Sequence, residues 1–198
     1  REGRNNLYGA KSADGGATWS RNVIVYRSPD GHICECCHPS AAIGAGGTLH
    51  AMWRNWLNGS RDLYLASSTD GGATFRSGKL GQGTWPLNAC PMDGGGLALD
   101  GSGNPVSVWR RDAAVYLDRP GAPEIEIGRG KDPSIAVGPE GVWVAWNGLG
   151  GLRVKGPGKA APELLDAAGE YVNLAGGEHV YAVWESRGRI SIRTLSGP

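Results

Sequence analysis

The sequence predicts an all-β protein built from repeated groups of short antiparallel strands, and three observations predict it. Gly accounts for 34 of the 198 residues, about 17% against roughly 7% in ordinary proteins, which is typical of a chain rich in turns. An eight-residue turn sequence occurs twice, at 12–19 and 68–75. A strand of alternating residues that ends in Trp occurs four times. The fold class therefore follows from internal repetition rather than from any single segment.

The first repeat is a turn. The two copies read Ser-Ala-Asp-Gly-Gly-Ala-Thr-Trp and Ser-Thr-Asp-Gly-Gly-Ala-Thr-Phe. In such a turn the Asp accepts backbone N–H groups, the two Gly adopt positive φ, and the final aromatic is expected to fill the space beside the strands. The residues concerned are Ser12, Asp14, Gly15, Gly16, Thr18 and Trp19 in one copy and Ser68, Asp70, Gly71, Gly72, Thr74 and Phe75 in the other.

The second repeat supplies the strands. Residues 38–44 resemble residues 132–138, and a Gly-containing turn and an alternating strand ending in Trp follow each. Further strands are expected at 62–66, 114–117, 151–154 and 189–193. We expect a core layer from the four strand-ending tryptophans, Trp53, Trp109, Trp146 and Trp184. Trp56 and Trp85 lie in insertions and are better placed for surface contacts.

Units of three or four short antiparallel strands have the dimensions of a propeller blade. The repeats delimit an outer half-blade at 1–30 and four blades at 38–84, 90–129, 132–166 and 170–198. The sequence thus predicts about four and a half four-stranded blades in a single domain, 1–198. Because an open arc would leave strand edges bare, we expect further residues, at the N-terminus at least, or a partner that covers the gap.

Composition and charge exclude other classes. The 20 Lys and Arg residues nearly balance the 19 Asp and Glu residues, which gives a formal net charge of +1 and no electrostatic reason to expect a nucleic-acid partner. No apolar run approaches the roughly 20 residues of a membrane span. Association with a membrane complex is the one membrane role left open.

The two turn motifs, set within four-stranded units, resemble those of the BNR/Asp-box repeat propellers, the group that includes sialidases. The resemblance covers nearly the whole chain and implies a six-bladed architecture. Sialidase-like enzymes use an arginine triad for the sugar carboxylate, an acid/base Asp, and a Tyr nucleophile polarised by a Glu. Their first arginine lies in a [FY]-R-I-P motif before an inner strand and a Gly-Thr-Leu turn. Here the matching stretch is 38–43 followed by 47–49, so His38 takes the arginine position. Residues 26–29, Tyr-Arg-Ser-Pro, resemble the motif itself but lie too far before the turn at 47–49.

Inner strands of a propeller line its channel, so residues that precede them should converge at the channel mouth. The repeat register predicts a channel-mouth set of His38, Arg54, Asp93, Arg110, Asp132 and Glu170. No catalytic residue is assigned, although two carboxyl groups suffice for glycoside hydrolysis, which makes Asp93, Asp132 and Glu170 the candidates. The other interpretation is that these groups cap strand ends or pair with nearby Arg side chains.

The cysteines form the least generic feature. Cys34, Cys36 and Cys37 precede His38, and Cys90 lies in the corresponding loop of the next blade, so we expect the four thiols to meet. Two disulfides, one of them from the cluster to Cys90, would suit an exported protein and add about 2–4 kcal/mol each. The alternatives are a free reactive thiol and a soft-metal site for Cu(I) or Zn(II), in which His38, His32 or the Met92 thioether assists the thiolates.

The leading hypothesis is an exported, periplasmic or extracellular, non-catalytic Asp-box propeller that needs no cofactor. It would bind another protein or a glycan at the channel face, as a binding or scaffolding module or an accessory subunit. The first alternative is a sialidase-like glycoside hydrolase. The second is a copper or zinc protein that uses the segment from Cys34 to His38.

Overall fold

The computed structural model describes residues 6–29 and 32–196, so parts of the expected terminal units at 1–5, 30 and 197–198 lie outside the described residues. Within the described ranges the chain forms antiparallel sheets and a single short 3₁₀ turn, η1 (Ala45–Gly47). The first sheet pairs β1 (Leu7–Gly9) with β2 (Val23–Tyr26). The expected all-β class is therefore confirmed.

The second sheet holds five strands: β3 (His32–Ile33), β4 (Ser40–Ile43), β5 (Leu49–Leu57), β6 (Ser60–Ser68) and β7 (Arg76–Lys79). The third holds β8 (Gly96–Leu99), β9 (Pro105–Arg111), β10 (Ala114–Asp118) and β11 (Ile125–Arg129). The fourth holds β12 (Lys131–Gly138), β13 (Gly141–Gly148), β14 (Gly151–Lys155) and β15 (Glu163–Asp166). The fifth holds β16 (Gly169–Ala175), β17 (Tyr181–Ser186) and β18 (Arg189–Thr194).

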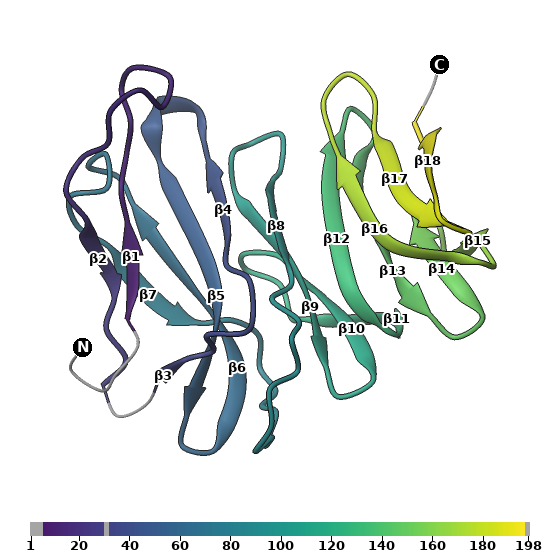
Figure 1. Cartoon of the computed structure of the whole chain (residues 1–198), viewed down its shortest axis with the longest axis horizontal. Helices are drawn as coiled ribbons and strands as arrows, with labels where there is room; N and C mark the ends of the chain where they lie inside the picture. The colour runs from purple at the N-terminus through teal and green to yellow at the C-terminus, as the bar shows by residue number, and fades with distance from the viewer. Residues whose placement is uncertain (1–5, 30–31, 197–198) are drawn as a thin grey trace.

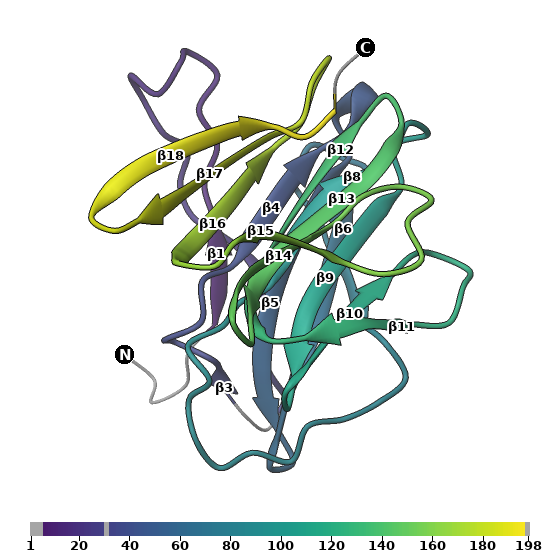
Figure 2. The same cartoon turned by 90° about the vertical axis from the view of Figure 1, so that its right-hand side faces the viewer.

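The sheets stand side by side in chain order, from β1 and β2 at one end of the row to β16–β18 at the other (Figure 1). Viewed from the β16–β18 end, they lie one behind another (Figure 2). Their first strands are neighbours, because β4 contacts β8, β8 contacts β12, and β12 contacts β16. Short hairpins keep each sheet local in sequence. Asn58 and Gly59, for example, both adopt positive φ between β5 and β6, as a two-residue hairpin turn requires.

The core is a series of interfaces between successive sheets. Each interface has its own cluster of buried side chains: Val25, Trp53 and Ala66; Met52, Leu63 and Trp109; Val106, Val115 and Trp146; and Ala145, Leu152 and Trp184. The four tryptophans are at most 7% exposed, so the predicted core layer is confirmed. One large aromatic therefore fills each junction, and stability depends on contacts between neighbouring sheets, as in other repeat folds.

Of three further aromatic residues, Phe75 matches the prediction, whereas Trp19 and Trp85 do not. Phe75 packs on the Trp53 cluster as expected, whereas Trp19 is 65% exposed, because its sheet has two strands in the described part of the chain. Trp85 is 8% exposed rather than a surface residue. The segment around Trp85 pairs back onto β6: the Arg61 N–H donates to the Trp85 carbonyl, and the Trp85 N–H donates to the Asp62 carboxylate.

The two repeated turns have matching hydrogen bonds. Asp14 accepts from the N–H and hydroxyl of Thr18, and Asp70 accepts from those of Thr74, at 2.6–2.9 Å. The pKa of Asp14 falls to about 2 because of these bonds and one from Ser12, and that of Asp70 is lowered for the same reason. Each ionised carboxylate thus organises its turn.

Candidate functional site

The first strands of four successive sheets border one open cleft of about 830 Å³. In each sheet the next strand holds the buried Trp, and the cleft residue is the one that pairs with the residue immediately before that Trp. These equivalent residues are Ser40, Gly96, Ser134 and Asn173. The cleft is therefore lined by the same place in each of four repeats. The repeated sheets alone bring these residues together, and no additional element is needed.

A bulge precedes this position in β12 and in β16. Lys131 pairs with Asn147 and Ser134 with Ala145, which leaves Asp132 and Pro133 without partners in the ladder. Tyr171 and Val172 are left in the same way in β16. Asp132 and Tyr171 adopt positive φ, 51° and 56°, and both line the cleft. Such bulges redirect side chains away from the alternation of a regular strand.

The bulge register corrects the expected role of Glu170. Tyr171, not Glu170, is the structural equivalent of Asp132, and Glu170 lines a separate cleft of about 320 Å³. Counting back from the tryptophans misses this by one residue, because Asn173 lies one residue nearer to Trp184 than Ser134 does to Trp146. Tyr171 is thus a cleft residue that sequence reasoning overlooked. The one feature of the sequence that could have identified it is the alignment of Val172 and Asn173 with Pro133 and Ser134.

In the second sheet the bulge is enlarged into the cysteine loop. Ile33 of β3 pairs with Asn55, and Ser40 of β4 pairs with Met52, so both strands lie on the same partner, β5. Residues 34–39 leave the sheet between them. The equivalent of a two-residue bulge thus becomes a six-residue loop that carries three cysteines and His38.

Three of the expected channel-mouth residues, His38, Arg110 and Asp132, line the cleft. The His38 ring lies 3.1 Å through Nε2 from the carbonyl oxygen of Gly95, which also accepts from the Ser40 hydroxyl at 3.0 Å. Met92 lines the cleft with a 72% exposed side chain. The ring of His32, another expected metal ligand, stacks on Trp56.

Asp93 lies beneath the cleft and is completely buried. Its carboxylate accepts from the backbone N–H of Asp132 at 2.9 Å and from that of Gly95 at 3.3 Å. Asp132 itself accepts from the Asn147 amide at 3.0 Å. Among the described residues, Asp132 is the one carboxylate that lines the cleft, so the three candidate carboxylates do not meet there.

Arg54 is also buried rather than displayed at the channel mouth, with 1% exposure. Its guanidinium donates to three backbone carbonyls, those of Asp93, Arg61 and Arg110, at 2.7–2.9 Å. Burial lowers the Arg54 pKa, and the nearby Asp93 carboxylate opposes that shift. The side chain therefore joins the second sheet to the third.

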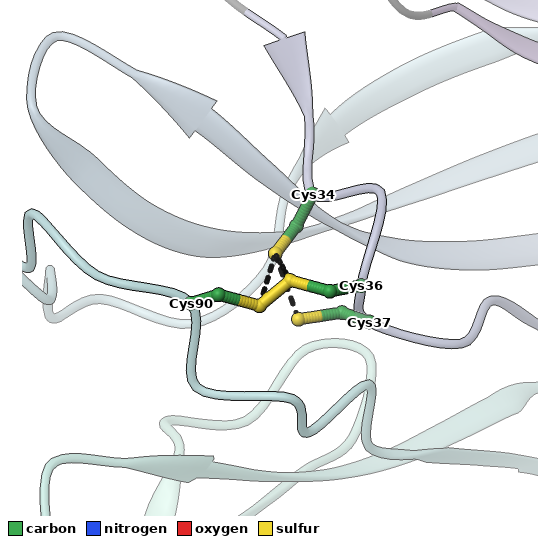
Figure 3. Close-up of side chains that lie close together, drawn as sticks. All are labelled: Cys34, Cys36, Cys37 and Cys90. Atoms are coloured by element: carbon green, nitrogen blue, oxygen red, sulfur yellow. Dashed lines mark hydrogen bonds between the residues drawn. A yellow bond between two sulfur atoms is a disulfide. The ribbon is translucent and has the colours of Figure 1, made fainter.

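The four cysteines converge in space (Figure 3), and the charge of Arg54 acts on Cys34 and Cys37. All four Sγ atoms lie within 4.8 Å of one another. Cys36 and Cys90 form a disulfide that joins the loop to the segment before β8. The Sγ atom of Cys34 lies 2.8 Å from that of Cys37 and 3.6 and 3.9 Å from those of Cys36 and Cys90. Cys34 and Cys37 are buried, whereas Cys36 and Cys90 are exposed.

The pKa values of the two buried thiols shift in opposite directions. A hydrogen bond from Cys37 lowers the pKa of Cys34, with help from the charges of Arg61 and Arg54, against the effect of burial. Donating that bond and being buried raise the pKa of Cys37. Of the two, Cys34 thus becomes a thiolate more readily, the form that binds metals and attacks disulfides.

No helix in the described part of the chain has the length and apolarity of a membrane span. No protein-family model and no curated protein sequence matches the chain. Among solved structures, a protein of unknown function from Dyadobacter fermentans DSM 18053 is similar with a TM-score of 0.61 and 18% identity, over 96% of this chain and 68% of that one. A glycosyl hydrolase from Bacteroides ovatus has a TM-score of 0.38 and 14% identity, over 75% of this chain and 59% of that one. The first similarity indicates a shared fold.

Proposed function

We propose that this chain is a non-catalytic binding module of the Asp-box propeller type that holds a segment of a partner protein in its cleft. The observation that carries the proposal is the repeated construction of that cleft. Four successive sheets present equivalent backbone positions, and bulges add exposed side chains to them. The row of sheets with adjacent first strands, and the two hydrogen-bonded Asp turns, support a propeller, and the resemblance to the Asp-box group implies the six-bladed type.

The side chains of the cleft favour a protein partner. Met92 and Tyr171 are 72% and 65% exposed, and both residue types are enriched where proteins bind one another. Arg110 and Lys131 provide positive charge beside them, and Asp132 provides negative charge. A cleft with this mixture suits a peptide segment that carries an apolar side chain and charges of both signs.

The distribution of carboxylates supports a non-catalytic role. Most glycosidases use two carboxyl groups about 5–9.5 Å apart across the sugar. Here Asp93 is buried and bonded to backbone N–H groups, and Glu170 lines another cleft. His38, at the position of the first triad arginine, contacts a backbone carbonyl. Asp132 therefore has no acidic partner among the described cleft residues.

The disulfide supports export to the periplasm or the extracellular space, because disulfides persist mainly in oxidising compartments. Cys36 and Cys90 are both exposed, so this bond would meet cytosolic reductants directly. An accessory subunit of an exported assembly fits these features.

Photo-crosslinking in the producing cells tests the binding role. A photoreactive amino acid is placed at Tyr171 or Met92 in the cleft, and at Leu149 as the control, because Leu149 is 92% exposed at a hairpin turn outside the cleft. We expect one discrete protein adduct from the two cleft positions and none from Leu149. Equal labelling from Leu149, or no adduct from the cleft, would contradict a protein partner.

Turnover assays test the non-catalytic role. We expect no hydrolysis of aryl sialosides or other aryl glycosides beyond that of the Asp132→Asn variant. Turnover that Asp132→Asn abolishes would overturn the proposal in favour of a hydrolase. Specific binding on a glycan array, lost on Tyr171→Ala, would replace the protein partner with a glycan.

A further inference from the structure

We infer that Cys34, Cys36, Cys37 and Cys90, when all four are thiols, form a tetrathiolate site for one tetrahedral divalent cation of the Zn(II) type. This goes beyond the binding role of the cleft, and it concerns a different group of residues. The Cys36–Cys90 disulfide and the metal use the same sulfur atoms, so the two states exclude each other.

Two of the sulfur separations match a compact four-ligand site, and the sulfur atoms of Cys36 and Cys90 move apart when their disulfide is reduced. Zinc–thiolate bonds of about 2.3 Å place the sulfur atoms of a tetrahedral site about 3.8 Å apart. The Sγ atom of Cys34 lies 3.6 Å from that of Cys36 and 3.9 Å from that of Cys90. The Cys34 and Cys37 sulfur atoms, now 2.8 Å apart, need to separate by about 1 Å to meet this geometry.

The ligands come from two segments that the fold already holds together. Three lie in the loop anchored on β5 at Ile33 and Ser40, and the fourth precedes β8 on the next sheet. A cation there would bind four protein ligands and leave no position for a substrate. Closed sites of this kind are structural rather than catalytic, so the metal would stabilise the junction between the second and third sheets.

The surrounding charge suits an anionic complex. A divalent cation with four thiolates carries a net charge of −2, and such a complex needs nearby positive charge when it is partly buried. The guanidinium of Arg54 is buried and donates to backbone carbonyls, and it acts on Cys34 electrostatically together with Arg61. The backbone N–H of Asp93 also donates to Cys37. The guanidinium groups of Arg54 and Arg61 thus supply positive charge near the complex, and the buried Asp93 carboxylate offsets part of it.

Cobalt(II) titration tests the inference. The whole chain is reduced with a phosphine under anaerobic conditions and titrated with Co(II), then with Zn(II). We expect one Co(II) per chain, with the visible bands of tetrahedral cobalt and a thiolate charge-transfer band, and displacement by Zn(II). The oxidised chain should give neither band. Octahedral cobalt spectra, or more than one loosely held ion per chain, would overturn the inference.

Serine variants identify the ligands. Replacing any of the four cysteines, one at a time, should reduce the charge-transfer intensity and weaken Zn(II) binding by at least about tenfold, since soft thiolates select this metal. Glu35→Gln is the matched control, because Glu35 is exposed in the same loop and lies outside the four-thiol group, and its binding should equal that of the unchanged chain. A loss in Glu35→Gln with no loss in one of the serine variants would place the ligands elsewhere.

Two further measurements keep the test decisive if the reduced chain unfolds. Near-ultraviolet circular dichroism reports the packing of the buried tryptophans, and we expect Zn(II) to restore that signal in the reduced chain. Alkylation followed by mass measurement should find four accessible thiols without metal and none in the Zn(II) complex. A reduced chain that neither refolds nor protects its thiols in Zn(II) would contradict the inference.

Discussion

The buried carboxylate of Asp93 accepts a 2.9 Å hydrogen bond from the backbone N–H of Asp132, on the neighbouring sheet. This bond holds the bulge of β12 in the position from which the Asp132 side chain enters the cleft. A residue considered for catalysis thus serves to fix the backbone of another.

Replacing Asp93 should cost more stability than replacing its partner. Asp93→Asn removes the charge that two buried N–H groups face, and we expect a loss of about 1.5–3 kcal/mol in the free energy of unfolding. Asp132→Asn is the control, with an expected change of less than about 1 kcal/mol, because the bond uses the Asp132 backbone. Urea unfolding followed by Trp fluorescence measures both. Equal losses would contradict the assignment.

The approach of the cysteine loop to the third sheet requires a glycine at 94. A Cβ atom there would overlap the carbonyl oxygen of His38, whereas one at Gly101 would have no heavy atom within 4 Å. We therefore expect Gly94→Ala to destabilise the fold by about 1–3 kcal/mol. Gly101→Ala should be neutral or slightly stabilising. Thermal unfolding of the two variants, side by side, decides the matter.

Arg54 donates to three backbone carbonyls at this junction. Arg54→Met should leave them unpaired and reduce the free energy of unfolding by about 3 kcal/mol or more. Arg193→Met, on the exposed side of β18, is the matched control and should change stability by less than about 0.5 kcal/mol. A mild effect at Arg54 would mean that water replaces the guanidinium.

The first Asp turn should make stability depend on pH in acid. The pKa of Asp14 falls from 3.8 to about 2 in the folded chain, so the carboxylate stabilises the fold above about pH 4 and this stabilisation disappears as the pH falls toward 2. Carboxyl NMR titration should give a midpoint near pH 2. Urea unfolding at pH 6 and pH 3 should show a smaller difference in Asp14→Asn than in the unchanged chain, and an identical difference would argue against the assignment.

Strands and core aromatics were predictable because they depend on local patterns. The alternation before Trp53, Trp109, Trp146 and Trp184 marks one strand in each of four sheets, and burial of a large aromatic at a repeated position follows from the period. Convergence of Cys90 with the other cysteines was predictable for the same reason, since adjacent repeats place equivalent loops side by side.

The finer features of the site depend on contacts that the repeat pattern does not contain. The bulges of β12 and β16 have the same form, but Asn173 lies one residue nearer to Trp184 than Ser134 does to Trp146. Counting back from the tryptophans therefore predicts Glu170 where Tyr171 lies. Arg54 and Asp93 bond backbone groups far away in the chain, which no motif records. Trp85 became buried because a segment expected to be an insertion pairs with β6.

The cysteine loop leaves and rejoins the same strand, with Ile33 opposite Asn55 and Ser40 opposite Met52. Its length is consequently uncoupled from the pairing on either side of it. Chain can be added between those two anchors without displacing a cross-strand pair, provided that the loop still clears Gly94 and keeps the Cys36–Cys90 disulfide. The fold thereby offers a graft position at the rim of its cleft, where a foreign recognition loop could be installed while the neighbouring sheets keep their register.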